Sequence, residues 1–133
     1  MSDYASAAEV FEAIDRLEAD AAGRLRRLGR ELSGARAFTS SALTDHAHHR
    51  QVRARQRARL GLGSAALATT TESDDPSLSG LRGAQEALVY AHAEGCPALG
   101  DALAVHALMA NMVDLARHLT VIDLWREREE ARG

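Results

Sequence analysis

The residues best suited to chemistry are in the segment TDHAHHRQ, which contains Asp45, His46, His48 and His49. At about 100° per residue, Asp45 and His49 lie one turn apart on the same helical face. His48 lies on one shoulder of this face and His46 on the opposite shoulder. The other positions on the face are Phe38, Ala42, Val52, Gln56 and Leu60. Two potential metal ligands therefore interrupt a face that we predict to be buried.

Glu18 interrupts the apolar pattern of the preceding segment in the same way. The series at helical spacing is Phe11, Ile14, Glu18, Ala21 and Leu25. If the chain turns back at residues 33–34, residues whose numbers sum to about 67 lie opposite one another, so that Glu18 faces His49. The spacing thus places Glu18, Asp45 and His49 at one level, facing inward.

Burying an unpaired carboxylate costs free energy, so the carboxylates of Glu18 and Asp45 would need partners for their negative charge. Carboxylate oxygen and imidazole nitrogen are ligands of iron, manganese and zinc, and helical bundles build such sites in their cores. One interpretation is a metal ion bound by Glu18, Asp45 and His49. The other is a Glu–His–Asp hydrogen-bond network that satisfies itself without an ion.

Four helices must position these side chains. They are predicted over residues 6–32, 35–60, 79–94 and 98–130, in one domain that spans residues 1–133. The composition supports helices, because 46% of the residues are hydrophobic and only 4% are aromatic, which is typical of cores built from alanine and leucine. Ser6 and Glu9 have the spacing of a capping box, and Gly34 is a natural stop for the first helix. The sequence Gly95-Cys96-Pro97 is predicted to form the turn before the fourth helix.

The lengths of the connections predict the topology. Short turns make the first and second helices one antiparallel pair, and the third and fourth helices another. The connector over residues 62–77, of about 16 residues, can reach roughly 50 Å, whereas a helix of ~26 residues is about 39 Å long. We therefore predict an all-α, antiparallel four-helix bundle in which a long crossover joins two helical hairpins. A simple up-down-up-down bundle with a loose connector is the alternative.

The helix directions decide which residues of the second hairpin lie at the same height as Glu18, Asp45 and His49. With a crossover, Glu86 and His106 lie at about the same height, so these two residues and His48 are possible additional ligands. His92 is predicted to be a core or capping residue, and His118 is predicted to lie on the surface.

The charge pattern argues against several classes of function. The net charge of −3 is unlike that of a protein that binds nucleic acids or membrane surfaces. Arginines at residues 50–59 are predicted to form a solvated face that pairs with the acids of the first helix, rather than a phosphate-binding stripe. No apolar run is long enough for a membrane span, and the acidic start is unlike a signal peptide. With Cys96 as the single cysteine, we expect a soluble cytoplasmic protein.

Two stretches carry a resemblance to a known superfamily. Residues 37–61 resemble the second helix of bacterial ferritin-like domains, with Asp45-x-x-His48 where those domains have Glu-x-x-His. Residues 84–118 resemble the third and fourth helices, with Glu86 at the bridging carboxylate. The second Glu-x-x-His is replaced by Leu115-Ala116-Arg117-His118, so its carboxylate is lost. The resemblance implies a ferritin-like fold with a degenerate metal site, iron as the first candidate metal, and oxidase chemistry if the protein is an enzyme.

Two hypotheses follow. In the first, the bundle binds iron, manganese or zinc through Glu18, Asp45 and His49, and a bound iron ion would add the handling of iron and oxygen. In the second, the bundle is metal-free and acts as an assembly or partner-binding module, in which the C-terminal helix contributes apolar residues near its end. These apolar residues are Ile122, Leu124 and Trp125. A homo-oligomer is expected in either case.

Overall fold

The computed structural model describes residues 4–65 and 71–132. Within these residues the regular structure is helical throughout. The helices are α1 (Ala7–Glu31), the short 3-10 helix η1 (Ser33–Ala35), α2 (Arg36–Arg59), α3 (Leu78–Leu99) and α4 (Ala102–Arg132). The predicted capping residue starts α1, because the Ser6 hydroxyl accepts a hydrogen bond from the backbone N–H of Glu9. No described helix is long and apolar enough to cross a membrane.

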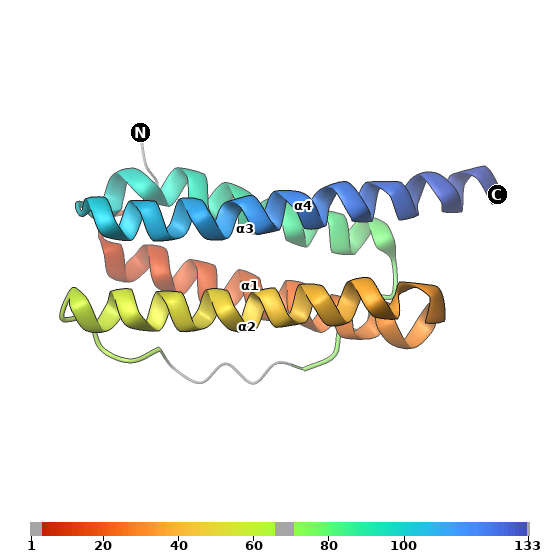
Figure 1. The fold of residues 1–133 in the computed structure, drawn as a ribbon, viewed down its shortest axis with the longest axis horizontal. Coiled ribbons are helices and arrows are strands. Elements are labelled where there is room, and N and C mark those ends of the chain that lie inside the picture. The colour runs from red at the N-terminus through yellow and green to blue at the C-terminus, as the bar shows by residue number, and fades with distance from the viewer. Residues whose placement is uncertain (1–3, 66–70, 133) are drawn as a thin grey trace.

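The helices form an antiparallel four-helix bundle with one long crossover, as predicted. Helix α2 runs antiparallel to α1. The connection after α2 leads back to the other end of the bundle, so that α3 runs in the same direction as α2 (Figure 1). Helix α1 packs against α2 and α3, and α4 packs against α3 and α2. Each helix therefore contacts two neighbours around one central axis, and we call the interface between two neighbouring helices a seam. The α2–α4 seam is less closely packed than the other three.

The crossover connector is attached to the flank of α1. The backbone N–H of Ser73 donates to the carbonyl of Gly23 (3.1 Å), and Arg24 donates to Asp75 (2.9 Å). A Cβ atom at Gly23 would lie 2.3 Å from the carbonyl oxygen of Thr71. A glycine is therefore required in the middle of α1 for the connector to approach the helix this closely.

The end of the third helix differs from the prediction. Helix α3 continues through the expected turn to Leu99, and it ends at Gly100, whose φ of 63° is left-handed. Gly95 serves packing instead of a turn, since a Cβ atom there would lie 2.5 Å from Cγ1 of Val10 on α1. Asp101 then accepts a hydrogen bond from the N–H of Ala104 (2.9 Å) and so starts α4.

The bundle core is apolar near both ends and polar in its middle third. One apolar cluster includes Phe11 and Leu108, and the other includes Leu28 and Ile122. Between these ends lies a set of buried polar and charged side chains. They are Glu18, His46, His49, Arg53, Gln85, His92, Asn111 and His118.

Candidate metal centre

The inward face of α2 is rotated from the predicted face. Ala42 and His49 belong to both, but the remaining buried positions are Thr39, His46, Arg53 and Arg57. His46 is therefore a core residue, and the expectation that it lies on the far shoulder is wrong. The predicted face followed Phe38 and Val52, which are two of the large apolar residues of this stretch. The observed face buries polar side chains that find partners on α1.

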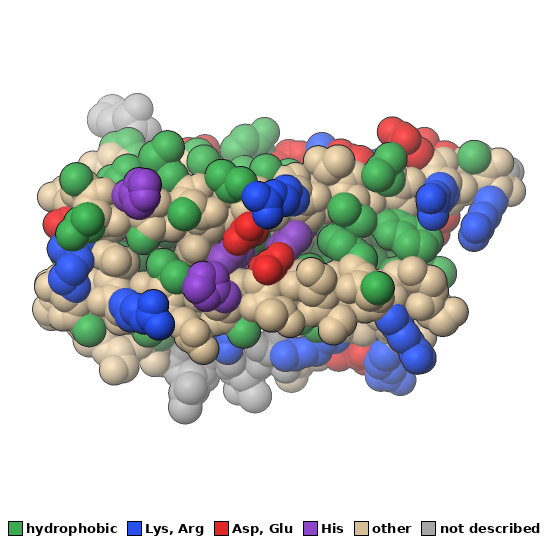
Figure 2. Space-filling view, in the orientation of Figure 1, with side chains coloured by type: hydrophobic (Ala, Val, Ile, Leu, Met, Phe, Trp, Pro, Cys, Tyr) green, Lys and Arg blue, Asp and Glu red, His purple; other side chains and the backbone are tan. Residues whose placement is uncertain are grey.

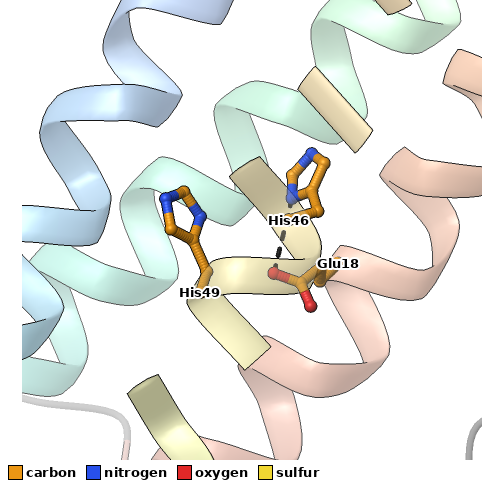
Figure 3. Close-up of side chains that lie close together, drawn as sticks. All are labelled: Glu18, His46 and His49. Carbon is orange, nitrogen blue, oxygen red and sulfur yellow. Dashed lines mark hydrogen bonds and ion pairs between the residues drawn. The ribbon is translucent and has the colours of Figure 1, made fainter. Parts of the chain in front are cut away.

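Glu18, His46 and His49 form a buried cluster at the middle of the bundle (Figure 3). Each residue is at most 2% exposed. The carboxylate and one ring nitrogen of each histidine all lie within 4.8 Å of one another. Glu18 reaches in from α1, and the two histidines are three residues apart on α2. This cluster could hold a metal ion.

The Glu18 carboxylate also forms a buried ion pair with Arg53. Two guanidinium nitrogens of Arg53 donate to Oε1 (2.6 Å) and Oε2 (3.1 Å), and His46 Nδ1 lies 3.4 Å from Oε2. Burial alone would raise the pKa of Glu18. The hydrogen bonds from His46 and Arg53, with the charge of Arg53, outweigh burial and lower this pKa to about 2. Glu18 is therefore an anion at neutral pH although water does not reach it.

Arg53 and Arg57 are buried, which corrects the expectation of a fully solvated arginine face. The Nε–H of Arg53 donates to Asp15 (2.8 Å), and Arg57 donates to the same carboxylate. The prediction that these arginines pair with acids of the first helix is confirmed. The α1–α2 seam beside the cluster is therefore lined by guanidinium groups that are paired with acids of α1.

At the α2–α4 seam, two carboxylates each bind a buried histidine. His49 Nε2 donates to Asp114 on α4 (2.8 Å), and His118 Nε2 donates to Asp45 (2.9 Å). His118 is 5% exposed, so its predicted surface position is wrong. Burial lowers the pKa values of both histidines, although the carboxylates oppose this effect. Both imidazoles are therefore neutral at pH 7.

Helices α3 and α4 contribute two further layers of polar side chains to the core. Gln85 on α3 donates to His118 Nδ1 (3.0 Å). Since α3 and α4 are antiparallel, His92 and Asn111, each two helical turns from this pair, occupy corresponding positions. His92 Nδ1 donates to the carbonyl of Leu88 (2.7 Å). Burial lowers the pKa of His92 to about 4, despite this hydrogen bond. Its core position agrees with the prediction.

Several buried polar atoms in this region have no hydrogen-bond partner among the described residues. They are His46 Nε2, His49 Nδ1, Gln85 Oε1, His92 Nε2 and Asn111 Nδ2. The other ring nitrogen of each of these histidines donates to an oxygen. Because the lowered pKa values keep His49 and His92 neutral, the unpartnered nitrogens of these two rings carry lone pairs. The core presents an excess of electron-pair donors, which suits a cation or water.

The remaining predicted ligands lie apart from the Glu18–His46–His49 cluster. Asp45 is at the α2–α4 seam, where it binds His118. His48 is exposed on α2, and its ring centre is 6.3 Å from that of His49. His106 is exposed on α4. Glu86 is half-buried on α3 and forms an ion pair with Arg82.

Sequence reasoning missed four residues of the site. They are His46, Arg53, Asp114 and His118. One available signal was the combination of acids in the first helix with arginines in the second, because a buried arginine needs a carboxylate opposite it. The spacing Asp114-x-x-x-His118 mirrors Asp45-x-x-x-His49 on the facing helix, and it was a second signal.

No known protein family, curated protein or solved structure matches this chain. The resemblance to ferritin-like domains therefore remains a prediction.

Proposed function

We propose that this protein binds a divalent transition-metal ion in the core of the bundle, through Glu18, His46 and His49. The observation that carries this proposal is the convergence of three buried ligand groups within 4.8 Å. Two imidazoles and one carboxylate form a donor set that proteins use for iron(II) and zinc.

The surroundings of the ligands support the proposal. His49 donates one ring N–H to Asp114, while its other ring nitrogen is buried and unpartnered. A carboxylate that orients a histidine in this way is the usual outer partner of a metal ligand. Arg53 plays the same part for Glu18, because it can keep its contact with Oε1 while Oε2 binds the ion.

The protonation states also favour an ion. Metal binding competes with protons for imidazole nitrogen and carboxylate oxygen. At neutral pH Glu18 is ionised and His49 is neutral, since both pKa values are lowered. These two ligands therefore have no proton to release when an ion binds.

Iron is the metal that the ferritin-like resemblance suggests, and it would add oxygen chemistry to the proposal. Zinc suits the same two-nitrogen, one-oxygen set without redox chemistry. Manganese prefers oxygen-rich sites. We therefore rank manganese below the other two.

The test is metal analysis of protein produced with added iron, zinc or manganese and then dialysed. The wild type should retain about one ion per chain, and both Glu18→Gln and His49→Ala should lose it. His106→Ala is the matched control, because His106 is an exposed histidine away from the cluster. Circular dichroism confirms that each variant is folded. A wild type that retains no metal, or folded variants that retain it fully, would contradict the proposal.

A second candidate function is self-assembly through the outer face of α4. Leu103, Val113 and Leu124 lie on this face, and each is more than half exposed. Leu103 and Leu124 are nearly equidistant from Val113 along the helix, so an antiparallel second copy would pair the two leucines across a twofold axis. Sedimentation should detect a dimer that Val113→Glu dissociates, with Arg55→Glu at an exposed position on α2 as the control. A monomeric wild type would exclude this assembly.

A further inference from the structure

The seam between α2 and α4 contains two acidic side chains that bind buried histidines. Asp45 and Asp114 have side chains that are 39% and 29% exposed. Each binds a histidine that is almost fully buried, His118 and His49 respectively. Figure 2 shows acidic and histidine side chains together along this seam. The carboxylates therefore connect solvent with the interior.

The His49 side chain connects the α2–α4 seam with the buried cluster. Its Nε2 donates to Asp114 at the surface, and its ring belongs to the cluster with Glu18 and His46. His48 lies just outside, exposed on the same helix, with its ring centre 6.3 Å from that of His49. A series of ligand groups thus leads from solvent to the core.

The other side of α2 is unsuitable for a cation. Arg50, Arg53 and Arg57 line the α1–α2 seam, and the four ion pairs that they form all go to acids of α1. A divalent ion approaching there would meet the guanidinium of Arg50, whose side chain is 57% exposed. The α2–α4 seam has one cation at the corresponding level, Arg117, which is 74% exposed and bound to Asp114. The α2–α4 seam is also the less closely packed of the two.

We propose that His48, Asp45 and Asp114 form a loading site that captures a hydrated divalent metal ion and passes it through the α2–α4 seam to Glu18, His46 and His49. This inference rests on the proposed function. Each water that the ion loses along this route is replaced by a carboxylate oxygen or an imidazole nitrogen. A group that assists passage without binding the final ion changes the rates of uptake and release equally, and it leaves the equilibrium affinity unchanged.

The test measures the rate of Co²⁺ uptake by stopped-flow absorbance, the rate of Co²⁺ release to a chelator, and the equilibrium Kd. His48→Ala and Asp45→Asn should slow uptake and release about tenfold each, since local charge and ligands raise association rates by this order. The Kd should change less than about twofold. Asp45→Asn keeps an oxygen that can accept from His118, which protects the fold.

Two further variants sharpen the test. Arg117→Gln removes the cation at the seam and should accelerate uptake, a change in the direction opposite to that of a damaged fold. His106→Ala, an exposed histidine elsewhere on α4, should leave both rates unchanged.

Uptake at the wild-type rate in His48→Ala and Asp45→Asn would overturn the loading site while the core metal site stands. A Kd that weakens in proportion to the slower uptake would also overturn it, because the residues would then be ligands of the final ion. If the wild type binds no Co²⁺ and no other metal, the proposed function fails first.

Discussion

Replacing Arg53 by methionine should destabilise the metal-free protein strongly. Arg53 is 1% exposed and binds both oxygens of Glu18, which is 2% exposed. The pKa of Glu18 is lowered from 4.5 to about 2, and a difference of this size corresponds to roughly 3 kcal/mol. Without the guanidinium the carboxylate stays buried and uncompensated. We expect Arg53→Met to lower the free energy of unfolding at pH 7 by about 3–5 kcal/mol.

The assay is urea denaturation in the presence of a chelator, for wild type, Arg53→Met, Glu18→Gln and the double variant. Since both single variants break one ion pair, the double variant should lose less than the sum of the two by more than about 1 kcal/mol. Arg55→Met, an exposed position on the same helix, is the control and should change stability by less than about 0.5 kcal/mol. Additivity of Arg53→Met and Glu18→Gln would refute the coupling on which this reasoning depends.

Two other predictions concern the histidines. Because the folded state keeps His92 neutral with a pKa of about 4, against 6.5 for the free side chain, the unfolded state binds the extra proton between these values. The free energy of unfolding should therefore fall as the pH is lowered from about 6.5 to 4, by about 3 kcal/mol for this residue. His92→Gln keeps a donor for Leu88 and should flatten the pH profile, measured by thermal denaturation; an unchanged profile would exclude His92 as its source. His46→Leu should change the stability of the metal-free protein by less than about 2 kcal/mol, since it removes an unpartnered buried nitrogen and also the hydrogen bond from Nδ1 to Glu18, while metal retention is lost. A large loss of metal-free stability in His46→Leu would instead favour the ion-free hydrogen-bond network.

The topology and the meeting of Glu18 with His49 could be predicted from the sequence. The topology followed from connector length, which limits how far apart two helix ends can lie. The contact followed from hairpin register, because Glu18 pairs with His46 and Arg53, and these residues lie on either side of His49 in α2. A local turn fixes this register, and the few residues that separate the two helices leave it little freedom.

The rotation of α2 could not be predicted from an apolar pattern. Helix α2 buries more polar than apolar side chains, so the residues that usually mark a core face are a minority on it. Whether His46 or Asp45 turns inward depends on partners far along the chain. In the core, His46 and Arg53 form hydrogen bonds with Glu18, whereas at the seam Asp45 accepts a hydrogen bond from His118. The same long-range pairing explains why His118 is buried.

The polar middle of the bundle also argues against a purely structural role. Leaving a buried polar atom without a partner costs about 1–3 kcal/mol, and five such atoms occur in the middle third of the described bundle. Their combined cost approaches the whole stability of a typical domain, about 5–15 kcal/mol. Apolar side chains at these positions would remove that cost, as they do at both ends of the same bundle. Water can supply hydrogen bonds to the unpartnered atoms, but it adds no positive charge. A cation bound by Glu18, His46 and His49 would satisfy the unpartnered nitrogens of these two imidazoles, whereas Gln85, His92 and Asn111 would need water.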